Sequence, residues 1–273
     1  MSLAPLPQPR DPSPAGGAYP QRIVSLAPSV TEILYALGAG PRVVGVTRDC
    51  DWPPEARRQA LDIGGWLDVR DARISDLAPD LILAATALPD RISALLQVGV
   101  TPVLSVDPKT LDDVLAIIAL IGQAVGTAIM AQALVDDMRR RMAAIALSAA
   151  RRPRRPRLYV EEWHKPPTAA GRWVPELATW AGAEAGLAAR GQPSQEMTDA
   201  AVLAYDPEVI VLAWSGFGAT AQPQQIITRP GWSQITAVRN GQVHVMDDRL
   251  LNRPGPRLLL GLRQLADLLA RVE

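Results

Sequence analysis

Short apolar runs alternate along the chain with stretches whose apolar residues recur every three or four positions. The short runs follow Pro, Gly or acidic residues, as strands do after turns, whereas the periodic stretches are typical of amphipathic helices. Strands are predicted in this way at 22–27, 42–47, 80–84, 102–106, 157–160, 209–214 and 243–247. Strands that alternate with helices indicate an α/β fold in which each parallel sheet is flanked by helices.

The longest periodic stretch is TAIMAQALVDDMRRRMAAIALSA, residues 127–149, which contains neither Pro nor Gly. Its apolar residues at three- and four-residue steps predict one stripe along a helix: Ile129, Met130, Ala133, Leu134, Met138, Met142, Ile145 and Ala146. Some 22 helical residues make a rod of roughly 33 Å, about the width of a small domain. Because it lies between two halves of the chain that resemble each other, we interpret it as the helix that joins two lobes.

The two halves repeat the same order of elements. Each opens with a strand, a polar loop and a helix, and the segment DLAPDLILA of the first half is answered by AYDPEVIVLA in the second. A long period that occurs only twice indicates a lobe duplication and not a solenoid. We predict two α/β lobes, each with a parallel sheet, and a ligand cleft between them. The predicted domains are a disordered Pro-rich tail (1–20), an N-terminal lobe (21–126), a connecting helix (127–150) and a C-terminal lobe (151–273).

Charge and composition argue against several classes of protein. Lys plus Arg and Asp plus Glu both number 28, so no net field would hold nucleic acid or an anionic membrane. We interpret the basic run at 151–157 as a complement to the C-terminal end of the long helix, with a nucleic-acid patch as the alternative. No apolar run is long enough for a transmembrane helix, and residues 1–20 lack the layout of a secretory signal. The single cysteine, Cys50, rules out an internal disulfide.

The aromatic residues are mostly tryptophan, with seven Trp, four Tyr and one Phe. Open α/β sheets bind ligands outside the carboxyl ends of their strands, and five Trp residues lie in or beside loops that follow predicted strands: Trp52, Trp66, Trp163, Trp173 and Trp214. A cleft lined by such rings suits a large, flat and partly apolar ligand. Ser29, at the start of the first helix, either faces that cleft or only caps the helix.

Motifs of catalysis are sparse. The chain contains no Gly-x-Ser-x-Gly, no phosphate-binding loop and no dinucleotide fingerprint, and its only histidines are His164 and His244. Asp49, Cys50 and Asp51 lie close together, but no His is near them and a metal cage needs three or more converging ligands. We therefore expect a protein that holds a ligand, with no catalytic residues, resident metal or cofactor.

Several segments together resemble a known family. They are RIVSLAPSVTEILYALGAGPRVVGVT, CDWPP, IGGW, DLAPDLILA, GVTPVLSVD and, in the second half, EW…PP…AGRWVPEL…AGA. In order and spacing, from about Arg22 to the C-terminus, they are similar to the helical-backbone class of bacterial solute-binding proteins, and most of all to its vitamin B12 (cobalamin)-binding members. The resemblance implies two α/β lobes, one connecting helix and delivery of the ligand to the membrane permease of an ABC importer.

The resemblance also implies which residues line the ligand site. Trp66 falls where these proteins place an aromatic wall against the corrin ring, and Trp52 supplies the aromatic of a second wall in the loop that begins at Asp49. The wall of the second lobe falls near Ser194, which is not aromatic. Three residues are expected to substitute for it: Trp163, Trp173 and Phe217.

Two acidic residues are expected to dock the lobes on the transporter. The family's docking positions fall near Ala72 and Ala200, and their neighbours Asp71 and Asp199 are the acidic residues available there.

Two classes of function remain open from the sequence. The first is an uptake receptor, periplasmic or otherwise extracytoplasmic, for cobalamin or a related tetrapyrrole or metal chelate such as haem or a ferric siderophore. The second is a cytoplasmic corrinoid-handling protein or enzyme on the same fold. The receptor is expected to be a monomer whose partners are its ligand and a permease. His164 is either a ligand to the metal of that compound or a surface residue.

Overall fold

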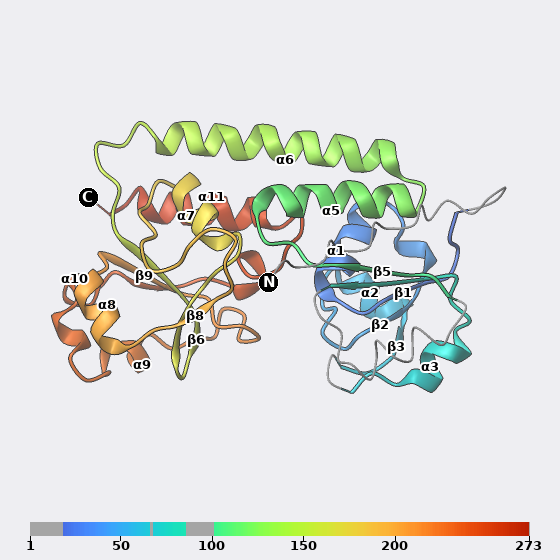
Figure 1. Cartoon of the computed structure of the whole chain (residues 1–273), viewed down its shortest axis with the longest axis horizontal. Helices are drawn as coiled ribbons and strands as arrows, with labels where there is room; N and C mark the ends of the chain where they lie inside the picture. Colours follow the sequence, from blue (N-terminus) through green and yellow to red (C-terminus); the bar gives the residue numbers. More distant parts are fainter. Residues whose placement is uncertain (1–18, 66–67, 86–100, 273) are drawn as a thin grey trace, which may run out of the picture. The chain divides into compact units, whose positions relative to one another are not determined.

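The structure, a computed structural model, describes residues 19–65, 68–85 and 101–272 (Figure 1). The chain divides into two compact units. The first contains Met1–Asp107 and Ile117–Leu134, and the second contains Pro108–Ala116 and Val135–Glu273. Helices α5 (Leu111–Ala124) and α6 (Ala128–Ala149) each contribute residues to both units, so the division passes within these two helices.

The first unit is built on five parallel strands in the order β3-β2-β1-β4-β5. They are β1 (Ile23–Ser25), β2 (Val43–Val46), β3 (Leu61–Asp62), β4 (Leu81–Ala85) and β5 (Val103–Val106). The central strand β1 buries Val24 in a cluster with Ile63 and Ile82. The predicted parallel sheet of the first lobe is therefore confirmed.

Short helices flank this sheet: α1 (Pro28–Ala36), η1 (Gly40–Arg42), α2 (Pro54–Gln59) and α3 (Asp71–Asp76). Helix α1 begins with Pro28, whose fixed φ suits the first helical turn. Its N-cap is Ala27, and no side chain caps the helix, so the predicted cap by Ser29 is wrong. The Thr31 hydroxyl donates to Ser25 Oγ (2.8 Å) and to the carbonyl of Ala27 (3.1 Å).

The second sheet is mixed, in the order β10-β9-β6-β7-β8. Its parallel part consists of β6 (Leu158–His164), β9 (Val209–Leu212) and β10 (Val243–Val245). Strands β7 (Pro167–Ala169) and β8 (Gln195–Glu196) extend it in antiparallel fashion. The parallel part follows the predicted plan, whereas the antiparallel strands were not predicted, because polar residues and prolines gave them the composition of a loop.

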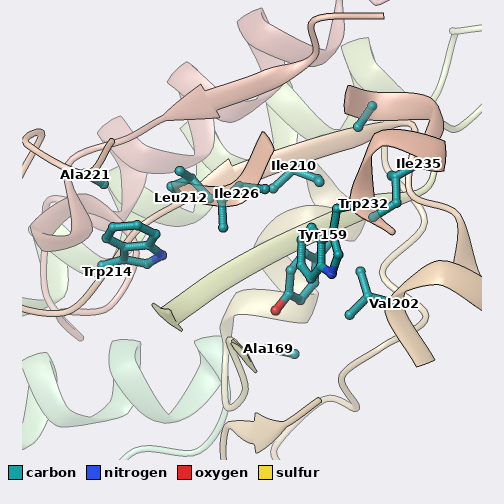
Figure 2. Close-up of a cluster of buried hydrophobic side chains, with 11 residues drawn as sticks. Tyr159, Ala169, Val202, Ile210, Leu212, Trp214, Ala221, Ile226, Trp232 and Ile235 are labelled. Carbon is teal, nitrogen blue, oxygen red and sulfur yellow. The ribbon is translucent and has the colours of Figure 1, made fainter. Parts of the chain in front are cut away.

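Helices and turns of the second unit pack around this sheet: α7 (Val174–Trp180), α8 (Asp199–Tyr205), α9 (Gln224–Ile227), η2 (Trp232–Gln234), α10 (Thr236–Arg239), η3 (Asp248–Leu250) and α11 (Leu258–Leu269). Figure 2 shows the apolar cluster on one side of the sheet, where Tyr159 of β6 packs near Trp232, and Trp214 follows β9. The core of this unit is therefore unusually rich in large aromatic side chains.

Helix α6 confirms the long helix predicted over 127–149. Its buried stripe differs from the predicted one, because Ala131 and Val135 are buried while Ile129 (87% exposed) and Met130 face solvent. The α5–α6 turn explains this shift. A Cβ placed on Gly122 would lie 2.3 Å from the Ala131 Cβ, so the two helices approach each other through their small residues. Within the described residues, no helix combines the length and apolarity needed to cross a membrane.

Candidate functional site

Four aromatic rings meet at the carboxyl ends of β6 and β9. Trp163 and His164 are the last two residues of β6, and Trp214 and Phe217 follow β9. Ring centroids are 4.5 Å apart between His164 and Trp214 and 5.0 Å apart between Trp163 and His164. Phe217 lies 5.6 to 5.9 Å from each of the other three rings. These are contact separations for aromatic pairs, and we call the four residues the aromatic platform.

The platform is buried at its base and open to solvent elsewhere. Trp214 is fully buried, whereas 39% of Trp163 and 36% of Phe217 is exposed. His164 is half-buried, and its Nδ1 has no hydrogen-bond partner among the described residues. Two large exposed rings on a packed base, at the strand ends where α/β sheets bind ligands, offer a surface for a flat apolar compound.

A buried ion pair supports the platform from the core. Glu161 of β6 is fully buried, and its carboxylate pairs with Arg229 through contacts of 2.6 and 2.9 Å. The same carboxylate accepts hydrogen bonds from Trp214 Nε1 (2.9 Å) and from the Tyr159 hydroxyl (3.1 Å). Burial raises the pKa of Glu161, and the bonds from these three partners oppose that shift. A buried charge satisfied by four donors holds its neighbours in one arrangement.

Arg229 connects this ion pair to the backbone of the platform. Its guanidinium donates to the carbonyl of His164 (2.8 Å) and lies 4.5 Å from the ring centroid of Trp232. Because the guanidinium is planar and presents several donors, one residue orients Glu161 and the end of β6 together.

A second carboxylate ties the strand to its antiparallel neighbours. Glu162 accepts hydrogen bonds from the hydroxyls of Ser194 and Ser215, and Ser194 Oγ in turn accepts from the backbone N–H of Gly171 (3.1 Å). Ser194, where the resemblance places a wall aromatic, therefore serves as a polar connector.

A family model described as periplasmic binding protein matches residues 23–250. The chain belongs to this family. It is a solute-binding protein of the ABC-importer type, and the family is one of binding proteins and not of enzymes.

Individual relatives align along most of its length. An uncharacterized ABC transporter substrate-binding lipoprotein, YvrC of Bacillus subtilis, is 33% identical over 257 residues, covering 91% of this chain and 79% of the relative. A vitamin B12-binding protein of Vibrio cholerae is 29% identical over 249 residues, covering 89% and 87%. Among solved structures, the periplasmic haem-binding protein RhuT of Roseiflexus is 26% identical with a TM-score of 0.78, covering 93% and 98%.

In the first unit of this periplasmic binding protein, two loops at the strand ends are held together. Arg48 donates from its backbone to the Gly64 carbonyl (2.9 Å), and its side chain pairs with Asp68 at 2.6 Å. The Asp68 carboxylate also accepts the N–H of Gly65 (2.8 Å), a bond that lowers the pKa of Asp68. In the loop after β2, 46% of Trp52 is exposed.

Other predicted residues of the first unit are placed differently. Asp49 is exposed in the same loop as Trp52, whereas Ser29 is buried in the first turn of α1. Cys50 is buried against the hydroxyls of Thr31 and Thr47. No group of three or more His, Cys, Asp or Glu that could hold a metal ion occurs among the residues the structure describes.

Two of the predicted ligand-lining tryptophans lie in the core. Trp214 is fully buried, and only 5% of Trp173 is exposed. The indole of Trp214 donates to Glu161, and that of Trp173 donates to the carbonyl of Leu251 (2.7 Å). Since both side chains are buried, neither ring presents a face to solvent in this structure.

The remaining predicted positions are the wall residue Trp66 and the docking pair. Trp66 lies outside the described residues. Asp71 is the first residue of α3, although its side chain lies outside the description. Asp199 is the exposed first residue of α8, and its carboxylate accepts a hydrogen bond from Trp232 Nε1 (2.8 Å).

Sequence reasoning missed Glu161, Arg229 and Asp248, the charged residues that organise the platform. Glu161 stands in a run of strand residues, and a carboxylate there is a signal of a buried partner. Its partner is 68 residues away in the chain, however, and only the fold reveals it. Asp248 accepts the backbone N–H groups of Gly216 (3.0 Å) and Gly218 (2.6 Å), on either side of Phe217.

Proposed function

We propose that this protein captures a corrinoid of the cobalamin type outside the cytoplasmic membrane and delivers it to the permease of an ABC importer. The observation that carries the proposal is the exposed pair Trp163 and Phe217 on their buried base. A corrinoid has broad apolar faces, which pack on aromatic rings, and an amide-bearing rim, which forms hydrogen bonds with polar loops. The similarity to vitamin B12-binding proteins and to a binding lipoprotein supports both the ligand and the location.

The first unit offers further candidate contacts. Trp52 is exposed in a loop stiffened by two prolines, and Trp66 is carried over from the family resemblance. Each is a separate part of the proposal, and mutation tests each separately.

Haem is the second candidate, and His164 is the observation that favours it. Its imidazole stands beside both exposed rings of the platform, and neutral imidazole is a common axial ligand of haem iron. The similarity to a haem-binding protein supports this alternative as well.

We further propose that Asp199 contributes to docking on the permease. It is exposed at the N-terminus of α8, and the hydrogen bond from Trp232 fixes the direction of its carboxylate. An oriented surface carboxylate suits a basic residue of a partner, since electrostatic complementarity sets the register of docking. Asp71 is proposed for the same task in the first unit.

Absorbance titration and calorimetry of the purified protein with cyanocobalamin, haemin and a ferric catecholate test the ligand. We expect cyanocobalamin to bind at one equivalent. Haemin binding with a shifted Soret band that His164→Ala abolishes would instead establish the haem alternative. If none of the three compounds binds, the proposed ligand class is wrong.

A further inference from the structure

Phe217 stands in a loop between two glycines. Its neighbours Gly216 and Gly218 both have positive φ, 86° and 58°, a backbone region that glycine enters freely. Within the loop, the Phe217 N–H donates to the carbonyl of Trp214 (2.9 Å), and the Phe217 carbonyl accepts the N–H (3.1 Å) and the hydroxyl (2.7 Å) of Thr220. A residue flanked by two glycines is mobile unless the surrounding structure holds its backbone.

The two glycines on either side of Phe217 are held from outside the loop, by the turn after β10. Asp248 is the first residue of η3 and only 5% exposed. One of its carboxylate oxygens accepts the N–H of Gly216 (3.0 Å), and the other accepts the N–H of Gly218 (2.6 Å). Asn252, one turn later, donates to the carbonyl of Ala213 (2.8 Å) and to Ser215 Oγ (3.1 Å). Side chains from one short segment therefore hold both ends of the loop.

We propose that Asp248 is the positioning residue of the aromatic platform: its two oxygens grip the backbone on both sides of Phe217 and hold that ring where a flat ligand packs. The inference rests on the proposed function, in which Phe217 contacts the ligand. Asp248 itself does not touch the ligand and acts through Phe217.

The neighbouring carboxylate of Asp247 does not take over these two hydrogen bonds. Asp247 is directed to Arg249, accepting from its backbone N–H (3.0 Å) and from its guanidinium (2.6 and 2.7 Å). A carboxylate satisfies two N–H donors at once, because it offers only acceptors. An amide in its place would turn an NH₂ group toward one of the two N–H donors, so the grip on one glycine would be lost.

The test compares Asp248→Asn with the matched control Asp247→Asn, which removes the same charge from the adjacent residue. In the free protein, hydrogen–deuterium exchange of the 215–218 amides is expected to rise about tenfold in Asp248→Asn and to stay unchanged in Asp247→Asn. Unchanged exchange in Asp248→Asn would overturn the inference, whether or not any ligand binds.

Affinity for cyanocobalamin then separates positioning from a general loss of structure. We expect Asp248→Asn to weaken binding about fivefold to tenfold, on the scale of one ordinary hydrogen bond. In a Phe217→Ala background the same substitution is expected to change affinity by less than about twofold, because its effect passes through that ring.

The outcomes keep the two claims apart. Equal losses with and without the Phe217 ring would show that Asp248 does not act through Phe217, and the positioning role would be rejected. If Phe217→Ala binds as well as the parent, the platform itself is not the ligand site and the proposed function loses its main support. If the parent binds no cyanocobalamin, the same cycle is measured with haemin. Should neither compound bind, the proposed function fails. The exchange experiment alone then tests whether Asp248 restrains the backbone of the loop.

Discussion

The turn that leads into β4 of the first unit has a counterpart before β9 of the second. Ala78 and Asp206 occupy equivalent positions in these turns and have left-handed backbones, with φ of 42° and 46°. Each is followed by a proline and then by an acidic residue, Asp80 in one unit and Glu208 in the other. Two turns far apart in the chain therefore share an unusual backbone conformation as well as a sequence pattern.

The same polar contacts close both turns. Asp80 accepts the backbone N–H of Arg22 (2.9 Å), and Glu208 accepts that of Arg157 (3.0 Å). Each arginine also donates its Nε to the carbonyl of the residue before the left-handed one, at 2.9 Å and 3.0 Å. These contacts join the starts of neighbouring strands in each sheet. We therefore infer that the amino-terminal ends of the strands, which are alike in the two units, serve folding.

The two sheets differ at the opposite ends of the same strands. Counting along the aligned registers, Leu26 of the first unit corresponds to Glu161 of the second. Leu26 is buried among apolar side chains, whereas Glu161 is buried in its ion pair with Arg229. A folded sheet does not need a charge at this position, as the first unit demonstrates. The charge in the second unit is therefore explained better by the platform that it supports than by folding.

Removing one partner of the Glu161–Arg229 ion pair is expected to have the largest effect on stability. Arg229→Met retains most of the side-chain volume but leaves the Glu161 carboxylate buried without its cation. We expect the free energy of unfolding to fall by about 3–5 kcal/mol. Urea denaturation followed by tryptophan fluorescence measures this, because five of the seven tryptophans lie in the second unit.

The paired replacement Glu161→Leu with Arg229→Met gives the second unit the apolar character of the first. It is expected to recover part of the lost stability, since no uncompensated charge remains. Trp214, Tyr159 and the carbonyl of His164 still lose their partners, so recovery should be incomplete. A double variant less stable than Arg229→Met alone would mean that the comparison with Leu26 is wrong.

Ligand affinity offers the next sharpest comparison between the units. Trp163→Ala is expected to weaken cyanocobalamin binding by about 1–3 kcal/mol, as for a buried interface aromatic. Trp52→Ala, which removes an exposed ring of the first unit, is expected to cost less because the aromatic platform that carries the proposal belongs to the second unit. Calorimetry on both variants measures the difference. A larger loss of affinity in Trp52→Ala than in Trp163→Ala would mean that the main ligand contact lies in the first unit.

The features predicted correctly from sequence were those carried by local pattern. The long helix was found because it has no Pro or Gly, and the parallel strands because they follow turn residues. Thr110 and Asp113, three residues apart, likewise form a capping box, with reciprocal side-chain to backbone bonds of 3.2 and 2.9 Å. These features depend on residues three or four positions apart, which a sequence displays directly.

The features that were missed depend on partners distant in the chain. Counting tryptophans near strand ends could not separate exposed Trp163 from buried Trp214, because the acceptor that draws Trp214 inward is Glu161, on another strand. Likewise, Ala131 and not Met130 is buried in α6, since close approach to Gly122 requires a small side chain. Apolar periodicity depends on how hydrophobic each residue is. It carries no information on which side chains are small enough for two helices to approach closely.

Acidification is expected to change stability by a smaller amount, and it tests the role of Glu208 in the turn before β9. Burial raises the pKa of Glu208, but its hydrogen bonds with Arg157 and Arg154 outweigh this and leave the pKa below its usual value. A lowered pKa means that the ionised form stabilises the fold above about pH 4.3, and that this contribution is lost as the pH falls through the folded-state value. Glu208→Gln is therefore expected to cost about 1 kcal/mol at pH 7 and progressively less below pH 4.3.

Thermal melting of parent and variant between pH 3 and pH 7 measures this dependence. Glu196→Gln, at an exposed position of β8, is the control and is expected to change stability by less than about 0.5 kcal/mol at every pH. A pH-independent loss in Glu208→Gln would show that the residue contributes through packing and not through its charge.

The smallest expected effects on stability come from placing glycine at the left-handed position of each turn. They are expected to have opposite signs in the two units. Ala78 pays a steric cost for its left-handed backbone and is exposed, so Ala78→Gly should stabilise the protein by about 0.5–1 kcal/mol. Asp206 has the same backbone, but its carboxylate accepts the Thr236 N–H (2.7 Å) and hydroxyl (2.8 Å) and pairs with the Arg157 guanidinium (3.2 Å). Asp206→Gly relieves the backbone but loses all three contacts, and is expected to destabilise by about 1 kcal/mol. Differential scanning calorimetry of both variants resolves these shifts, and changes of the same sign would mean that side-chain bonding does not distinguish the two turns.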